Sequence, residues 1–296
     1  MSFDNAYEAL TEAEPDGEAR WAFGTGFDDP LSGVDTALPG GVDGAALAAY
    51  CTALGDDALI TSHRLTEWVT HAPELEEELA LANIALDLLG QARLLLSRAG
   101  QADGTGRTED ELAYFRDDRE FRNVRLAEVP HGDFAETVAR LLVLSTWRLA
   151  LFGGLTGSRD PVLAAIAAKG VKELTYHREY AARWVVRLGD GTETSHERMR
   201  RGLDDVWPYV AELFATHDVD RRVVEAGVGV DPAETRAEFD EVLEQVLGAA
   251  TLSRPEVPAL AGVAGRAGRD GIHTEHLGYL LSEMQSLARA HPEATW

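Results

Sequence analysis

The chain has 296 residues, 45% of them hydrophobic, so it can bury a substantial core and is not an intrinsically disordered sequence. Its 51 acidic and 27 basic residues give a net charge of -24, which repels nucleic acid and anionic membrane surfaces. The single cysteine, Cys51, excludes an internal disulfide framework and a cysteine-built metal site. Because Cys51 lies among small apolar residues, we expect it in the core.

The basic residues are almost all arginine, since the chain contains just two lysines, Lys169 and Lys172. Excess acid with so little lysine suggests halophilic adaptation, in which a salt-rich cytoplasm screens the self-repulsion. The alternative is a GC-rich genome that favours arginine codons, which explains the missing lysines but not the acids. The acidic N-terminus has no signal-peptide pattern, and no segment offers the roughly 20 uncharged apolar residues of a membrane helix. We therefore expect a soluble, cytoplasmic protein.

Two regions follow each other along the chain. Residues 1–40 contain glycine, proline, aspartate and short apolar islands without a period, which predicts an extended or disordered acidic arm available to a partner. From residue 41 apolar residues recur every three or four positions, which predicts a single helical domain over 41–296. No alternating strand pattern is found. Helices are expected at about 43–72, 73–100, 108–121, 133–158, 160–189, 194–216, 232–250 and 273–290.

The longest helices carry boundary signals. Pro73 suits the first position of the second long helix and Gly100 its end. Asp133 is placed to cap the third, while Asp160 caps the fourth, which Gly189 stops. Four helices of more than twenty residues, joined by short or moderate loops, predict an all-α fold. We expect a four-helix bundle with additional C-terminal helices.

Such bundles can hold two irons. They then use a Glu from each of two helices and a Glu-x-x-His motif from each of the other two. Residues three apart lie on one helix face, so both side chains of the motif reach the same metal pair. Six ligands are needed, and each predicted helix can be compared with this pattern.

The fourth helix keeps half of one motif. Its apolar stripe consists of Leu163, Ile166, Gly170, Leu174, His177, Ala181 and Val185. His177 should therefore face the core, but Leu174 stands three residues earlier, where the partner Glu belongs. Glu173 is rotated about 100° away, toward the flank of the helix. This half-site has its histidine and lacks its carboxylate.

The other helices supply even fewer donors. On the second helix we expect the stripe Leu79, Ala82, Leu86, Gly90 and Leu94 to face inward. That stripe brings Asp87 and Gly90 near the interior at the motif spacing, but glycine offers no ligand. The first helix offers Asp56, Asp57 and Glu67, and the third only Ser145 and Thr146. Counted generously, Asp57, Asp87 and His177 are three ligands of six. We therefore predict no catalytic, cofactor-binding or metal-binding residue, and a degenerate di-iron site at Asp57, Asp87, Gly90, Ser145, Leu174 and His177.

Plainer interpretations of these residues stay open. A lone core histidine such as His177 is usually a satisfied buried polar group, and Asp57 is more often a flank residue. Lys169 and Glu173 have the spacing of an ordinary helix-surface pair. A sharper hypothesis is that a cation has entered the former metal cavity, for which the candidates are Lys172, Arg64 and Arg93.

The segment "GIHTEHLG" (271–278) is a second candidate for metal binding. It contains His273, Glu275 and His276, but the spacing is not that of the His-Glu-x-x-His zinc motif, and no third ligand is evident. It is better explained as a helix start with Thr274 or His273 near the cap.

Three segments and the C-terminal Trp296 resemble the C component of the phenylacetyl-CoA epoxidase (ring 1,2-epoxidase) system. They are "LTEWVTHAPELEEELALANIALDLLGQARLLLSRAG", "RDPVLAAIAAKGVKELTYH" and "GIHTEHLGYLLSEMQ". The resemblance covers about residues 45–296 and is specific, because the segments are long and in the same order. The acidic arm departs from the family.

The resemblance implies a ferritin-like fold and a place in aerobic phenylacetate breakdown. It implies that a related A subunit holds the di-iron centre that epoxidises the ring, while a reductase supplies electrons from NADPH through FAD and iron–sulfur cofactors. The C subunit lacks iron ligands and supports A structurally, which agrees with the separate ligand count. Two alternatives remain: an autonomous di-iron oxygenase or metal store using Asp57, Asp87, Glu173 and His177, and a helical scaffold with unrelated partners.

Overall fold

The computed structural model describes residues 31–294, and within that range the protein is helical. The α-helices are α1 (Gly44–Trp68), α2 (Leu75–Ala102), α3 (Glu109–Tyr114), α4 (Arg125–Glu128), α5 (Phe134–Leu155), α6 (Pro161–Gly189), α7 (Glu193–Val206), α8 (Asp218–Glu225), α9 (Arg236–Ala249) and α10 (Glu275–Ala290). The 3₁₀ turns are η2 (Val69–His71), η3 (Asp118–Glu120), η4 (Trp207–Phe214), η5 (Pro232–Thr235) and η6 (Gly268–Asp270). Most of the predicted N-terminal arm, residues 1–30, lies outside the described residues, as does Trp296.

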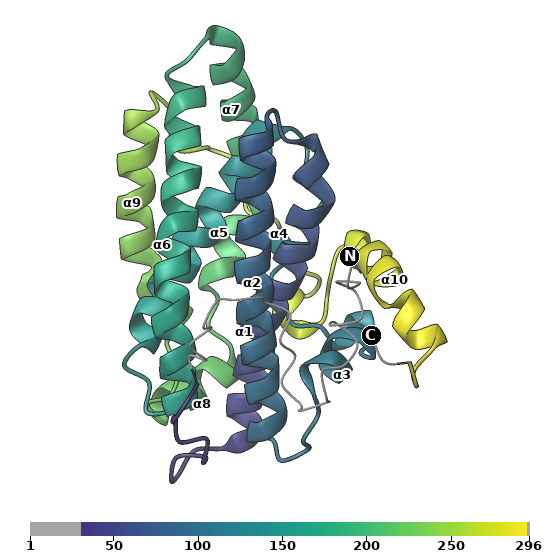
Figure 1. Ribbon diagram of the computed structural model, residues 1–296. Helices are drawn as coiled ribbons and strands as arrows, with labels where there is room; N and C mark the ends of the chain where they lie inside the picture. The colour runs from purple at the N-terminus through teal and green to yellow at the C-terminus, as the bar shows by residue number, and fades with distance from the viewer. Residues whose placement is uncertain (1–30, 295–296) are drawn as a thin grey trace, which may run out of the picture.

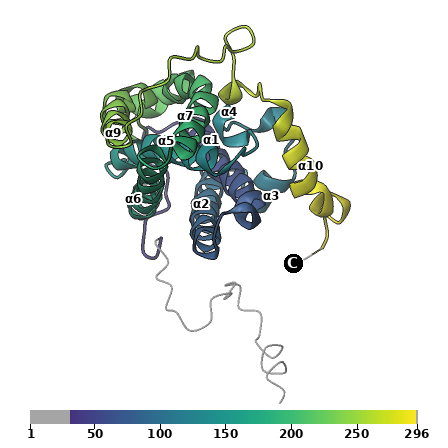
Figure 2. The same ribbon diagram turned by 90° about the horizontal axis from the view of Figure 1, so that it is seen from above.

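The four long helices form a bundle, which confirms the predicted fold class. α1 packs along α2, α5 packs along α6, and α2 contacts α6 across the bundle (Figure 1). Seen from above, α9 lies against the α5–α6 side, while α10 lies apart from it next to α3 (Figure 2). The C-terminal helices therefore cover two different sides of the bundle.

The predicted boundary signals act largely as expected. The Asp133 carboxylate accepts from the backbone N–H of Glu136 at 3.1 Å, and Asp160 caps α6 in the same way. Gly189 is the last residue of α6, and a larger residue would not fit there, because a Cβ would lie 2.5 Å from the carbonyl oxygen of Ala250. Several boundaries differ. α2 begins at Leu75 and continues past Gly100 to Ala102, and the helix predicted at 194–216 breaks into α7 and η4. The helix predicted at 43–72 divides into α1 and η2, and the one predicted at 108–121 divides into α3 and η3.

The inward face predicted for α6 is confirmed, since every residue of its stripe is buried. The inward face predicted for α2 is wrong. Leu79 and Leu86 are 58% and 55% exposed, whereas Leu81, Leu88 and Leu95 are buried. α2 carries leucines on opposite sides, so its hydrophobic period does not tell which side faces the core.

α5 is the central helix of the bundle. α2 and α5 are each long and apolar enough, by length and composition alone, to cross a membrane, but 89% of the apolar window of α5 is buried inside the protein. Two charged side chains, Arg140 and Arg148, are nevertheless buried on this helix. An arginine in such a core requires partners, and those of Arg148 define the site described next.

Candidate functional site

A small cavity of about 20 Å³ lies in the bundle core between the four long helices. Its lining residues are Asp57, Thr61, Leu88, Leu141, Leu144, Ser145, Trp147, Arg148, Leu174 and His177. Four of the six predicted positions of the degenerate site thus meet around one cavity. The other two, Asp87 and Gly90, are not part of the lining, because the core-facing side of α2 is rotated from the predicted one.

His177 is fully buried and bonded on one side. Its Nε2 lies 3.0 Å from Oδ2 of Asp87, whose side chain is about one-third exposed at the edge of the bundle. A carboxylate can only accept, so Nε2 carries the proton of this bond. The other ring nitrogen, Nδ1, is buried without a partner. His177 is therefore only half satisfied.

Asp57 is a core residue, so its interpretation as a flank residue is wrong. Its carboxylate receives both terminal nitrogens of Arg269, at 2.9 and 2.6 Å, and the backbone N–H of Val124 at 2.9 Å. Arg269 is 212 positions away in η6, which explains why no local pattern revealed the pair. The carboxylate that most resembled a metal ligand is thus neutralised by the protein itself.

None of the three cations proposed for the cavity lines it, and the cation found there is Arg148. Arg148 lines the cavity and is 4% exposed. The three proposed cations lie elsewhere: Arg64 bonds the carbonyl of Glu128 and the carboxylate of Glu67, and Lys172 and Arg93 are exposed. An arginine in the middle of an otherwise apolar helix was the sequence signal for this role.

Arg148 begins a chain of polar contacts across the bundle. Its Nε donates to Oε1 of Gln91 at 3.0 Å, and the amide of Gln91 donates to Glu173 at 2.9 Å. Glu173 in turn pairs with Lys169, as predicted, although its carboxylate also reaches inward. Gly170 makes room for this arrangement, because a Cβ there would lie 2.5 Å from the ring of Phe152, which packs against the Arg148 guanidinium.

These residues do not fit a di-iron centre. Leu174 has no donor atom, and the Ser145 hydroxyl donates to the carbonyl of Leu141. Among residues 31–294 no group of three or more His, Cys, Asp or Glu side chains could hold a metal ion. Of the four ligands in the autonomous-oxygenase alternative, Asp87 and His177 meet, whereas Asp57 and Glu173 bond other partners.

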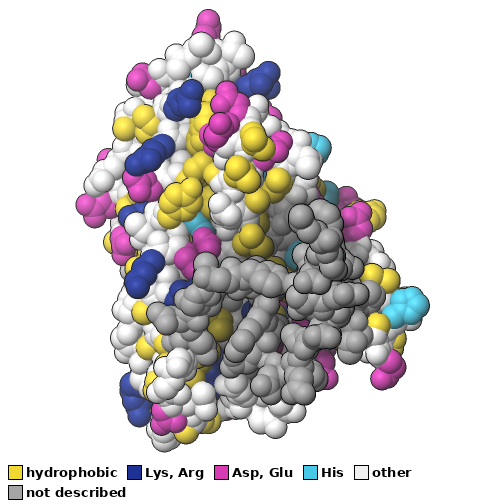
Figure 3. All heavy atoms as spheres, in the orientation of Figure 1, with side chains coloured by type: hydrophobic (Ala, Val, Ile, Leu, Met, Phe, Trp, Pro, Cys, Tyr) yellow, Lys and Arg dark blue, Asp and Glu magenta, His cyan; other side chains and the backbone are white. Residues whose placement is uncertain are grey.

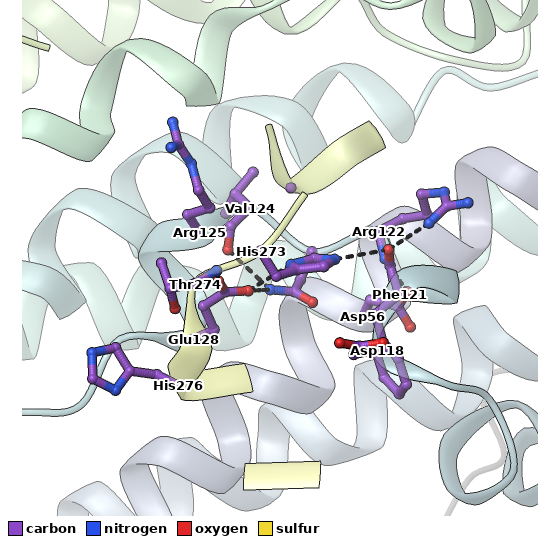
Figure 4. Close-up of polar contacts among 12 residues, drawn as sticks. Asp56, Asp118, Phe121, Arg122, Val124, Arg125, Glu128, His273, Thr274 and His276 are labelled. Carbon is purple, nitrogen blue, oxygen red and sulfur yellow. Dashed lines mark hydrogen bonds and ion pairs between the residues drawn. The ribbon is translucent and has the colours of Figure 1, made fainter. Parts of the chain in front are cut away.

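A second polar cluster involves the "GIHTEHLG" segment (Figure 4). His273 Nδ1 lies 2.7 Å from Glu128, and its Nε2 lies 3.0 Å from the carbonyl oxygen of Phe121. Glu128 also accepts from Asn123 and from the backbone N–H of Thr274, the N-cap of α10. His276 points away from this pair (Figure 4). The prediction of a helix start with Thr274 near the cap is confirmed.

Both nitrogens of His273 face acceptors, so the ring is held as an imidazolium. Burial by itself lowers the pKa of His273, but the hydrogen bond and the charge of Glu128 raise it overall. This buried ion pair ties α10 to α4 and thereby joins the C-terminal segment to the bundle. Its role is structural.

A larger cavity of about 110 Å³ is lined by residues of α1, α5, η4 and α8. Several of its polar groups are engaged within the protein: Arg269 pairs with Asp57, Glu212 pairs with Arg125, and the Tyr50 hydroxyl bonds the backbone of Val230. We assign no chemistry to it.

Comparison with known proteins gives two matches. The sequence profile of a family described as "Phenylacetic acid catabolic protein" matches residues 37–296. The chain is also 46% identical over 250 residues to the C subunit of the 1,2-phenylacetyl-CoA epoxidase of Escherichia coli (strain K12). That match covers 84% of this chain and 99% of the relative. The resemblance drawn from the sequence is thereby confirmed.

Proposed function

The chain belongs to the phenylacetic acid catabolic protein family, and from that premise we propose that it is the non-catalytic C subunit of a phenylacetyl-CoA 1,2-epoxidase that supports a di-iron A subunit. The observation that carries the proposal is the buried guanidinium of Arg148 beside His177, at the degenerate site. Metal ions are held by anionic or neutral donors, and a fixed cation at the same place opposes them. We therefore assign the iron to the A subunit, and NADPH, FAD and iron–sulfur chemistry to a reductase.

An apolar surface on α2 supports an obligate partner. Leu75, Leu79 and Leu86 are 65%, 58% and 55% exposed, and Tyr176 of the neighbouring α6 is 49% exposed. Figure 3 shows hydrophobic side chains gathered over the part of the molecule where α2 and α6 lie. We call this surface, Leu75, Leu79, Leu86 and Tyr176, the α2–α6 face. Such a contiguous patch is typical of a protein interface.

The energetics favour burial of this face in a complex. Each leucine that moves from water into an interface contributes roughly 1.5–3 kcal/mol. Obligate interfaces commonly bury more than about 2,000 Å² and are largely apolar. A groove of about 270 Å³ next to the face, lined by Glu77 of α2 and by α6 residues from Tyr176 to Arg187, gives a partner side chain a place to enter.

Co-expression with a di-iron A subunit of the same family tests the proposal. We expect one heteromeric species on size exclusion, with epoxidation of phenylacetyl-CoA once reductase and NADPH are added. Leu79→Asp should abolish co-elution, because it places a charge in the centre of the α2–α6 face. Leu287→Asp is the matched control, since Leu287 is equally exposed but lies on α10.

Two results would contradict the proposal. One is an A subunit that is soluble and fully active without this chain. The other is loss of all turnover in assembled, iron-replete complex that carries His177→Ala. That substitution should weaken stability or assembly and leave turnover in the surviving complex intact, because His177 bonds only Asp87.

A further inference from the structure

Three buried nitrogens around the 20 Å³ cavity lack a partner in the described structure. They are Nη2 of Arg148, Nε1 of Trp147 and Nδ1 of His177, and all three side chains line the cavity. The first two can only donate a hydrogen bond, whereas the third is the ring nitrogen left without a proton when Nε2 donates to Asp87. The lining hydroxyls donate elsewhere, since Thr61 bonds the carbonyl of Asp57 and Ser145 that of Leu141. The two obligate donors, on Arg148 and Trp147, therefore call for an acceptor in the cavity.

The charge of Arg148 has no counter-ion among residues 31–294. Its other nitrogens donate to neutral groups, Gln91 and the carbonyl of Leu54, each at 3.0 Å. Two carboxylates, Asp57 and Glu173, act on Arg148 through their charge, but Asp57 binds Arg269 through both oxygens and Glu173 is paired with Lys169. Burial lowers the pKa of Arg148 to about 10, which leaves it charged at neutral pH. One positive charge is thus uncompensated in the core, an arrangement that proteins avoid.

We propose that this cavity binds one monatomic anion, chloride in the cell, between the unpartnered donors of Arg148 and Trp147. An anion or a water molecule can accept from both obligate donors, but only the anion also cancels the excess charge. A cavity of about 20 Å³ admits one water-sized or ion-sized occupant and excludes polyatomic anions such as sulfate. The predicted degenerate metal site would thus bind an anion in place of a cation. This inference does not depend on the proposed function.

Anion-specific stabilisation provides the test. Thermal midpoints of the full chain are measured in potassium chloride, bromide and methanesulfonate at equal ionic strength. General screening acts in all three salts, whereas binding to the folded state adds a saturable rise with halide alone. Crystals soaked in bromide should show one anomalous peak beside Arg148. Equal midpoints in all three salts, together with no bromide peak, would overturn the proposal and leave a water molecule as the occupant.

Variants separate binding from folding. Arg148→Met should remove the halide-specific shift, but it also loses the Gln91 contact and can reduce folding. Ser145→Thr keeps a hydroxyl for the carbonyl of Leu141 and adds one methyl group to the cavity, so it should remove the shift in a folded protein. Arg183→Met, at an exposed position of α6, is the control and should keep the shift. Retention of the shift and the bromide peak in Ser145→Thr would contradict the assigned position.

Discussion

Asp57→Asn should strongly destabilise the protein. The carboxylate is 2% exposed and receives two nitrogens of Arg269 and the N–H of Val124. Asn keeps the size but removes the charge and turns an N–H₂ group toward a guanidinium. Arg269 is then left in the core without its carboxylate partner. Removal of one partner of a buried ion pair costs about 3–5 kcal/mol.

Urea unfolding, followed by circular dichroism, gives this free energy without adding ions. For a domain of this size the loss corresponds to a thermal midpoint lower by roughly 10 °C. The matched control is Glu179→Gln, which breaks the exposed Arg183–Glu179 pair on α6 and should change nothing measurable. In a double-mutant cycle, Asp57→Asn combined with Arg269→Met should cost less than the sum of the single changes. A cost below about 1 kcal/mol for Asp57→Asn, or additive effects in the double-mutant cycle, would refute the conclusion that Arg269 neutralises the Asp57 carboxylate.

Three further predictions concern packing, pH and salt. Gly170→Ala should lower the free energy of unfolding in urea by about 1–3 kcal/mol, because the new Cβ would meet the Phe152 ring. Gly153→Ala on α5 has open space and should raise it by about 0.5–1 kcal/mol, so equal effects of the two substitutions would contradict the packing argument. Because the pKa of His273 is raised in the folded protein, its contribution to stability is complete below the unfolded pKa of about 6.5 and is lost as pH rises through the folded pKa. The unfolding free energies of wild type and His273→Gln should therefore converge between pH 6 and pH 9, and a constant difference would argue against the imidazolium. The net charge of -24 predicts a thermal midpoint that rises from dilute to molar potassium methanesulfonate, and a flat midpoint would favour the codon explanation of the missing lysines.

The two apolar helices show how far the sequence could be interpreted. On α6 polar residues occupy the outer side, so one stripe stands out and each of its seven members is buried. On α2 leucines lie on both sides, and periodicity favoured the exposed one. The leucines on the exposed side of α2, which we propose contact a partner, are the reason why its orientation could not be predicted. Errors of this kind are expected wherever a helix carries apolar residues on its exposed side as well as on its buried side.

The positions without a metal ligand could be predicted from the sequence, but the charged side chains at the site could not. Leu174 and His177 were placed correctly, because both lie within one periodic helix. Arg269 could not be assigned to Asp57, since 212 residues and several turns separate them. Arg148 was visible as a charge within an apolar helix, but its contact with Gln91 depends on the orientation of α2. A position without a ligand can be recognised from the sequence of one helix, whereas the placement of a charged side chain at the site depends on the tertiary structure.

Iron bound by the isolated chain tests the central claim most directly. The chain is loaded anaerobically with Fe(II), desalted, and its iron measured by plasma emission beside its complex with the A subunit treated in the same way. Because Leu174 offers no donor and Arg148 and Arg269 supply the positive charge, we expect a stoichiometric iron pair in the complex and none in this chain alone. Two tightly held irons per chain would contradict the account.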